Sequence, residues 1–164
     1  MNPGYLVRTA GAGRRVAVVG DVYRFLATGK ETDGKYALID ATVPPGGGPP
    51  MHVHSREQEG FYVLEGAIAF RVQEGDGVKA IVATPGMSVH LPPGSRHAFR
   101  NESDAPARML ILLAPAGLEE MFLEVGVELT DADSTARPPT HEEIERLLAI
   151  APRYGVEILP PESV

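Results

Sequence analysis

The sequence predicts an all-β protein, an antiparallel barrel or double-sheet sandwich, with helices packed outside it at the C-terminal end. Short β-prone runs recur at nearly regular spacing along the first two thirds of the chain. Glycine and proline are abundant, at 18 and 15 residues, and they fall between these runs as turn residues. Helical periodicity begins only after about residue 116.

Composition limits the function classes. A chain of 164 residues suits one domain with a substantial core. The formal net charge is −7 and no block of Lys or Arg stands out, so a nucleic-acid partner is not expected. The absence of cysteine excludes disulfides, thiolate metal sites and cysteine nucleophiles.

Location and domain organisation follow from the same pattern. Residues 1–16 lack the apolar region of a signal peptide, and no apolar run approaches the length of a membrane span. We therefore expect a cytoplasmic protein without membrane contact. A single domain is expected over residues 1–164, with a barrel core from about 15 to 115 and a helical extension from about 116 to 164.

Four strands are predicted before the central part of the chain. Their ranges are Tyr5–Thr9, Val16–Val19, Asp21–Thr28 and Lys35–Val43, with a turn cluster of Gly, Asp and Thr before the last. Alternation in the last of these ranges places apolar residues on both faces, so we expect both faces to be partly covered.

The central part of the chain predicts further strands. Gly60–Leu64 and Ala67–Val72 are strongly β-prone and meet at Glu65-Gly66 in a tight connection. The cluster Glu74–Gly77 predicts a hairpin. The remaining predicted strands are Val78–Ala83, Ser88–Leu91, Arg96–Asn101 and Ala107–Ala114. The residues expected to line the barrel are Phe61, Val63, Phe70, Met87 and Phe99.

The stretch from Gly46 to Gly66 carries the first candidate site. His52 and His54 are two residues apart, so on a strand both imidazoles point to the same face. A following antiparallel strand can bring Glu59 to the same point. A pair of histidines after a Pro- and Gly-rich loop is ordinarily a solvated surface feature, so this stretch alone is a weak signal.

Two motifs resemble those of the cupin superfamily. Gly46, His52-x-His54, Glu59 and Gly66 stand at the spacing of the first cupin motif. The second motif is matched by Gly86, Pro92-x-Gly94, His97 and Asn101. The resemblance covers roughly residues 35 to 115 and is closest to the single-domain quercetin-dioxygenase-like cupins. It implies a double-stranded β-helix, or jelly-roll barrel.

The resemblance implies a metal centre. By it, His52, His54, Glu59 and His97 are the ligands of one divalent transition metal, and Glu59 is a candidate catalytic base. Nitrogen and oxygen ligands without thiolate suit Fe, Mn, Ni, Co, Cu or Zn. Four protein ligands in an octahedral shell leave two positions for water, dioxygen or a chelating substrate. Glu57, two residues from Glu59, is the alternative carboxylate.

Other polar residues are weaker candidates. His90 is expected to point away from the core if Val89 and Leu91 face it, and His141 is expected to be solvated. Anionic substrates can be bound by arginines, here Arg71, Arg96 and Arg100, although such residues on strands more often form a solvated face.

The C-terminal part predicts helices. Leu118, Met121, Phe122 and Val125 recur at helical spacing, and Gly126 follows as a stop signal. Thr140–Glu143 is a capping box that opens a second helix, whose Ile144, Leu147 and Leu148 share one face. Tyr154–Leu159 is either a short last strand or a docked tail. These elements are expected to cover an end or edge of the barrel.

Two function classes follow. The leading hypothesis is a mononuclear metal-dependent oxygenase, dioxygenase-like, that acts on a small aromatic or enol-type substrate. The alternatives are a small-molecule binding, sensing or structural cupin without catalysis, and a metal-dependent sugar isomerase or epimerase. Because non-catalytic cupins often lose one of the four ligands, the resemblance favours an enzyme. A homodimer is expected from exposed edge strands and the apolar N-terminal segment.

Overall fold

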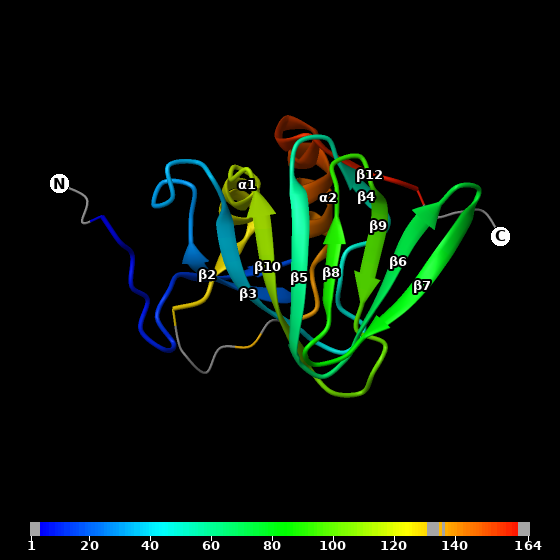
Figure 1. Ribbon diagram of the computed structural model, residues 1–164, viewed down its shortest axis with the longest axis horizontal. Helices are drawn as coiled ribbons and strands as arrows, with labels where there is room; N and C mark the ends of the chain where they lie inside the picture. The colour runs from blue at the N-terminus through cyan, green and yellow to red at the C-terminus, as the bar shows by residue number, and fades with distance from the viewer. Residues whose placement is uncertain (1–3, 131–134, 136, 161–164) are drawn as a thin grey trace.

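Two antiparallel sheets face each other in the computed structural model, which describes residues 4–130, 135 and 137–160 (Figure 1). The seven-stranded sheet contains, in spatial order, β11 (Val127–Glu128), β1 (Arg15–Val18), β2 (Asp21–Ala27), β3 (Ala37–Val43), β10 (Ala107–Ala114), β5 (Gln58–Glu65) and β8 (Ser88–Leu91). The five-stranded sheet contains β12 (Val156–Ile158), β4 (His52–His54), β9 (Arg96–Arg100), β6 (Ile68–Glu74) and β7 (Gly77–Ala83). The predicted all-β fold with C-terminal helices is confirmed.

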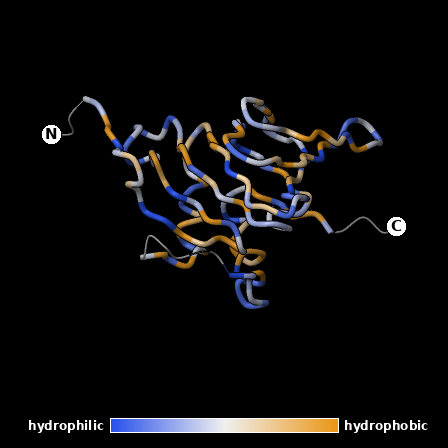
Figure 2. Tube along the Cα trace, turned by 90° about the horizontal axis from the view of Figure 1, so that it is seen from below, coloured by the Kyte–Doolittle hydropathy of each residue, from blue (hydrophilic) through white to orange (hydrophobic). Residues whose placement is uncertain are grey.

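The core lies between the two sheets, because alternate residues of each strand turn inward. Ile39, Ala41 and Val43 of β3 are fully buried. Phe61 packs against Phe70 and Phe99 with ring centroids 5.0 and 5.7 Å apart, close to edge-on. The alternation of hydrophobic and hydrophilic residues along the chain can be followed in Figure 2. The core holds the strands that carry the candidate site.

Four of the five residues expected to line the barrel are buried, and Met87 is not. Met87 is 40% exposed, because it lies in the turn after Gly86, where its sulfur is 3.4 Å from the backbone nitrogen of Thr84. The strand predicted over Tyr5–Thr9 is also wrong. These residues are exposed and do not pair with any described strand, and Arg8 instead contacts the carbonyl of Leu26 and the carboxylate of Glu31.

The connection at Glu65-Gly66 does not join paired strands. β5 and β6 belong to different sheets, so this turn carries the chain across the barrel. Gly66 has φ of +74°, and a Cβ there would lie 2.9 Å from Ala107. By contrast, the hairpin predicted at Glu74–Gly77 is confirmed, since these two end residues face each other across β6 and β7.

A backbone junction joins the two stretches that carry the candidate histidines. The N–H of Gly46 donates to the carbonyl of Asn101 at 2.8 Å, and the N–H of Asn101 donates to Gly47 at 3.0 Å. Gly48 has φ of +115° and lies so close to β9 that a Cβ there would be 2.1 Å from the carbonyl oxygen of Phe99. The Asn101 side chain donates to the carbonyls of Val43 and Ala105. The junction therefore sets the approach of β4 to β9.

The C-terminal elements lie against one end of the barrel (Figure 1). α1 (Glu119–Val125) buries Met121 and Val125, and the ring of Phe122 contacts that of Tyr23 at 4.9 Å. The predicted capping box of Thr140 and Glu143 opens α2 (His141–Ile150). None of the described helices is long and apolar enough to cross a membrane.

The second helix is less buried than its pattern predicts. Ile144 and Leu148 are 37% and 49% exposed, while Leu147 reaches the cavity described below. A 3-10 turn, η1 (Ala151–Tyr154), leads into β12, which pairs with β4. Of the two forms expected for Tyr154–Leu159, the structure has the strand.

Candidate metal centre

Three histidines meet on the inner face of the five-stranded sheet. His52 and His54 are the two ends of β4, and His52 stands directly opposite His97 of β9 in the antiparallel register. The His52 ring is centred 4.8 Å from that of His54 and 4.4 Å from that of His97. All three side chains are buried, so the predicted convergence of the imidazoles is present in the structure.

The carboxylate reaches this group from the opposite sheet. Glu59 belongs to β5, the next strand along the chain, as expected, but β5 pairs with β8 and β10 and lies in the other sheet, not beside β4. Its Oε2 lies 3.0 Å from Nε2 of His54 and 2.8 Å from Nε2 of His97. One ligand atom from each of His52, His54, Glu59 and His97 lies within 4.8 Å of the others. The cluster therefore spans the barrel interior.

Backbone carbonyls fix two of the rings. Nδ1 of His52 is 2.8 Å from the carbonyl oxygen of Pro50, and Nδ1 of His97 is 3.0 Å from that of Ser95. A carbonyl only accepts, so the geometry assigns the proton to Nδ1 in both rings. Nε2 is then left with its lone pair, which is the tautomer that binds a metal ion.

The arrangement of the buried atoms fits a metal ion. Nε2 of His54, Nε2 of His97 and Oε2 of Glu59 have no hydrogen-bond partner of suitable geometry, although Oε2 lies 3.0 and 2.8 Å from the two nitrogens. Two ligands about 2.1 Å from one ion at a right angle to each other are about 3.0 Å apart. Buried polar atoms without partners are costly, and a shared cation would satisfy all three. These residues form a cluster suited to metal binding.

Two groups of the cluster, His52 and Glu59, have pKa values shifted toward the ligand form. Burial, followed by the neighbouring His97 and His54, lowers the pKa of His52 to about 4, so its imidazole is neutral near pH 7. Burial raises the pKa of Glu59, but contacts with His54 and His97 outweigh it and bring that pKa well below its usual range. A neutral imidazole and a charged carboxylate are the forms that bind divalent ions.

The other candidates lie outside the cluster. Glu57 is buried behind His54, with its Oε2 3.9 Å from Nδ1, too far for a hydrogen bond. His90 is exposed on the outer face, where its ring covers Gly60. His141 is exposed and lies 3.1 Å from Glu145 on the surface of α2. Arg71 pairs with Glu102 at the surface.

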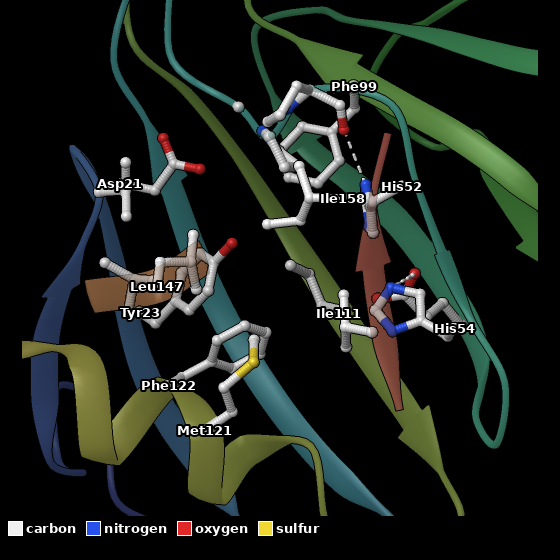
Figure 3. Close-up of a pocket in the computed structure, with 17 residues that line it drawn as sticks. Asp21, Tyr23, His52, His54, Phe99, Ile111, Met121, Phe122, Leu147 and Ile158 are labelled. Carbon is white, nitrogen blue, oxygen red and sulfur yellow. Dashed lines mark hydrogen bonds and ion pairs between the residues drawn. The ribbon is translucent and has the colours of Figure 1, made fainter. Parts of the chain in front are cut away.

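An apolar cavity opens beside the cluster (Figure 3). Its walls come from both sheets and from both helices, and its volume is about 100 Å³. The 17 lining residues are Val18, Val19, Asp21, Tyr23, Gly48, Pro49, Pro50, His52, His54, Glu59, Phe99, Ile111, Met121, Phe122, Leu147, Val156 and Ile158. The described lining contains neither lysine nor arginine, and the only carboxylate outside the cluster is Asp21.

The sequence did not single out Asp21 and Tyr23. Asp21 opens an apolar strand, a position that looks like an ordinary turn residue, and Tyr23 fits the β-prone pattern. The signal in the sequence was that Asp21, Tyr23 and Phe25 share one strand face, which places a carboxyl group on the buried side. Burial raises the pKa of Asp21 to about 7, although the backbone N–H of Gly48 opposes the shift.

The family comparisons agree with this geometry. Residues 39–113 match the cupin domain family, so the chain contains a cupin domain, as its motifs predict. The chain is similar in sequence to quercetin 2,3-dioxygenases. It is 26% identical over 142 residues to the enzyme of Aspergillus japonicus, covering 85% of this chain and 40% of that protein. It is 30% identical over 120 residues to that of Bacillus subtilis, covering 73% of this chain and 34% of that protein.

The chain thus spans less than half the length of these two relatives. Among solved structures, an RmlC-like cupin from Shewanella frigidimarina superposes with a TM-score of 0.59 at 19% identity, over 73% of this chain and 99% of that one. At this identity the likeness concerns the fold alone.

The raised pKa of Asp21 predicts a pH-dependent cost in stability. The carboxyl group has an ordinary pKa of 3.8 in the unfolded chain and a pKa of about 7 in the folded protein, so the wild type loses stability as pH rises between these values. Asn has no such titration. We expect Asp21→Asn to exceed the wild type in free energy of unfolding by roughly 2–4 kcal/mol at pH 8, with little difference near pH 4.

Urea unfolding of the metal-free proteins, followed by circular dichroism at both pH values, measures the difference. Asp76→Asn in the exposed β6–β7 turn is the control, and it should change stability little at either pH. A difference between Asp21→Asn and the wild type that is the same at both pH values would contradict the burial argument.

Proposed function

We propose that this protein is a mononuclear metal-dependent oxygenase that acts on a small aromatic or enol-type substrate, with His52, His54, Glu59 and His97 as the metal ligands. The observation that carries the proposal is the set of buried, unpartnered donor atoms at the wall of an apolar cavity. Similarity to quercetin 2,3-dioxygenases supports the oxygenase class.

The donor set suits Fe, Mn, Ni, Co, Cu or Zn as a divalent ion, because imidazole and carboxylate bind all of these. Such an ion would supply Lewis acidity and coordination positions open to dioxygen or a chelating substrate.

The residues of this chain hold the substrate and exclude water. Ile111, Phe122 and Ile158 give the cavity apolar walls that accept a ring. A substrate with two neighbouring oxygens can turn them toward the cluster, where the ionised carboxylate of Glu59 accepts the hydroxyl proton. Because the lining side chains are mostly apolar, a reactive enolate formed there is shielded from bulk water.

The cavity walls disfavour the sugar isomerase or epimerase class. A sugar carries many hydroxyl groups that need partners when buried, and outside the cluster the described part of the lining offers polar side chains only at Asp21 and Tyr23. A binding or sensing module would use the same donors and cavity without turnover, so it is an outcome of the activity test below.

We also propose a homodimer that buries the apolar N-terminal segment. Tyr5 and Val7 are 75% and 69% exposed, and the segment stands away from the barrel in Figure 1. Covering large apolar side chains that are this exposed removes them from water and so stabilises the complex with a partner.

Removing single ligands should remove the metal. His52→Ala and His97→Ala are each expected to lower the metal content of purified untagged protein at least tenfold, because three donors bind more weakly than four and a cavity replaces the ring. Elemental analysis measures the content. His90→Ala and His141→Ala, both at exposed histidines, are matched controls that should keep it. Unchanged content in both ligand variants would refute the ligand set.

Metal-loaded wild-type protein should consume dioxygen with at least one flavonol, catechol or diketone. Each of the six metals is loaded separately and uptake is followed with an oxygen electrode. Glu59→Gln, where it keeps the metal, is expected to lower kcat by about 10²-fold or more, since the proton acceptor is lost. If no metal supports oxygen uptake and the protein binds a ligand saturably, the oxygenase proposal is contradicted and the protein is a binding module. Unchanged turnover in Glu59→Gln would contradict the role of Glu59 as the base.

Removing the exposed apolar side chains should weaken the dimer. The double variant Tyr5→Ser and Val7→Ser is expected to shift the mass measured by light scattering from dimer to monomer. Leu148→Ser, at a residue that is 49% exposed on α2 and belongs to no edge strand, is the control and should leave the mass unchanged. A wild type that is monomeric at all concentrations would contradict the homodimer.

A further inference from the structure

Asp21 is the one carboxyl group in the described cavity wall that the proposed metal centre does not use. It is 3% exposed, and its Oδ1 has no hydrogen-bond partner. Figure 3 shows Asp21 across the cavity from His52 and His54, with the side chains of Ile111 and Ile158 between them. The cavity therefore has a second polar point, well separated from the cluster.

The surrounding chain holds this carboxyl group in place. Gly47 approaches so closely that a Cβ there would lie 2.6 Å from Oδ1 of Asp21, and the backbone N–H of Gly48 interacts with the same group. Gly47 has no side chain and so leaves room for the carboxyl group, and Gly48 supplies one donor, yet Oδ1 has no hydrogen-bond partner. A buried acceptor in this state gains from any ligand that donates to it.

Tyr23 adds a hydroxyl group to this polar part of the cavity wall, on the side toward the cluster. Its ring packs edge-on against Phe122 at 4.9 Å, which fixes its direction. Burial raises the pKa of Tyr23 well above its usual value, and the charges of Asp21 and Glu59 add to the effect. The hydroxyl is therefore neutral and lies within electrostatic reach of both carboxyl groups. It can donate to a ligand oxygen between them.

The electrostatics of the wall select an uncharged ligand. With a pKa of about 7, Asp21 is part acid and part carboxylate near neutral pH, so it can donate to a carbonyl or accept from a hydroxyl. The described lining contains no lysine or arginine that would balance an anionic group. A carboxylate placed beside Asp21 would be desolvated and repelled, while a hydroxyl would find a partner.

The geometry points to Asp21 as a substrate-binding residue that, with Tyr23, hydrogen-bonds a neutral hydroxyl or carbonyl at the far end of the substrate. The inference rests on the proposed function, because the near end of the substrate is placed at the metal ligands. It defines the substrate class as an uncharged enol or phenol with a chelating oxygen pair at one end and a hydroxyl or carbonyl at the other.

The cavity volume limits the size of this substrate. About 100 Å³ is less than the engineered cavity of about 150 Å³ that holds benzene in another protein. The enclosed part is therefore no larger than on the order of one small ring, so the polar substituents of a bound ring must reach the groups at the edges of the cavity. A larger molecule would have to extend through the mouth of the cavity.

Three hydroxypyranones test the inference. Allomaltol, kojic acid and comenic acid share one ring and one chelating hydroxyketone. At the carbon across the ring they carry a methyl, a hydroxymethyl and a carboxylate group, respectively. Calorimetric titration of Zn²⁺-loaded protein at pH 7.5 avoids redox chemistry, and the Zn²⁺ content is measured after each titration.

We expect wild-type protein to bind kojic acid about tenfold more tightly than allomaltol, because the added hydroxyl satisfies Asp21. Comenic acid should bind at least tenfold more weakly than kojic acid. In Asp21→Leu, the affinities for kojic acid and allomaltol should differ by less than about twofold, because the affinity for kojic acid falls while that for allomaltol is unchanged. Asp21→Asn should retain part of the preference and bind comenic acid better than the wild type does.

Comparison between variants cancels the intrinsic metal affinity of each probe. Leu147→Ala is the matched control, since it enlarges the same cavity from the apolar side of α2. It should weaken both neutral probes alike and keep their ratio. A general loosening of the cavity would instead lower the ratio in Leu147→Ala and Asp21→Leu together, and that outcome would overturn the role of Asp21.

The outcomes separate the inference from the proposed function. If allomaltol and kojic acid bind the wild type equally, the role of Asp21 is overturned while the chelating metal centre stands. Comenic acid binding as tightly as kojic acid would overturn the selection for a neutral group. If none of the three probes binds although Zn²⁺ is retained, the proposed chelation fails, and the inference that rests on it fails as well.

Discussion

The antiparallel pairing of β4 with β9 is the constraint on which the site depends, since it sets His52 directly opposite His97. Two short strands of three and five residues would pair weakly alone. The junction between Gly46-Gly47 and Asn101 closes one end of the pair, and the N–H of Gly94 donates to the carbonyl of His54 at 2.8 Å at the other. A shift by one residue would turn His97 away from the interior, so these bonds protect the metal centre as well as the sheet.

The interior of the barrel carries more polar groups than a stability argument would favour. Glu59, Asp21 and the three histidines of the cluster are buried, and several of their atoms have no hydrogen-bond partner. The desolvation of these groups lowers the stability of the folded state, and the packed core of Phe61, Phe70 and their neighbours can offset this loss. Departures of this kind from the rules of core packing are expected where a ligand completes the structure. An ion would complete the cluster, and a substrate hydroxyl would complete Asp21.

The motif spacing was informative because it reports on backbone geometry. The glycines at 46 and 66 have positive φ, and the chain can place His52, His54 and His97 only if such turns occur at fixed distances from them. Strand pairing across the barrel is not local, so the sequence did not show that Glu59 arrives from the other sheet. The same holds for Asp21, whose surroundings are made by residues 44–48. Whether residues 1–164 form the whole domain stays a prediction.

The cavity is lined partly by residues inside the segment that matches the cupin family and partly by residues outside it, and this division bears on substrate choice. The four cluster residues lie within residues 39–113, the part that matches the cupin family. Nine of the 17 lining residues lie outside it, on β1, β2 and the turn between them or after residue 120. One loop links the two groups, since the carbonyl of Pro50 orients His52 while Gly48 contacts Asp21. The family match therefore bears on the metal, whereas the flanking segments, and Asp21 above all, bear on which molecule reaches it.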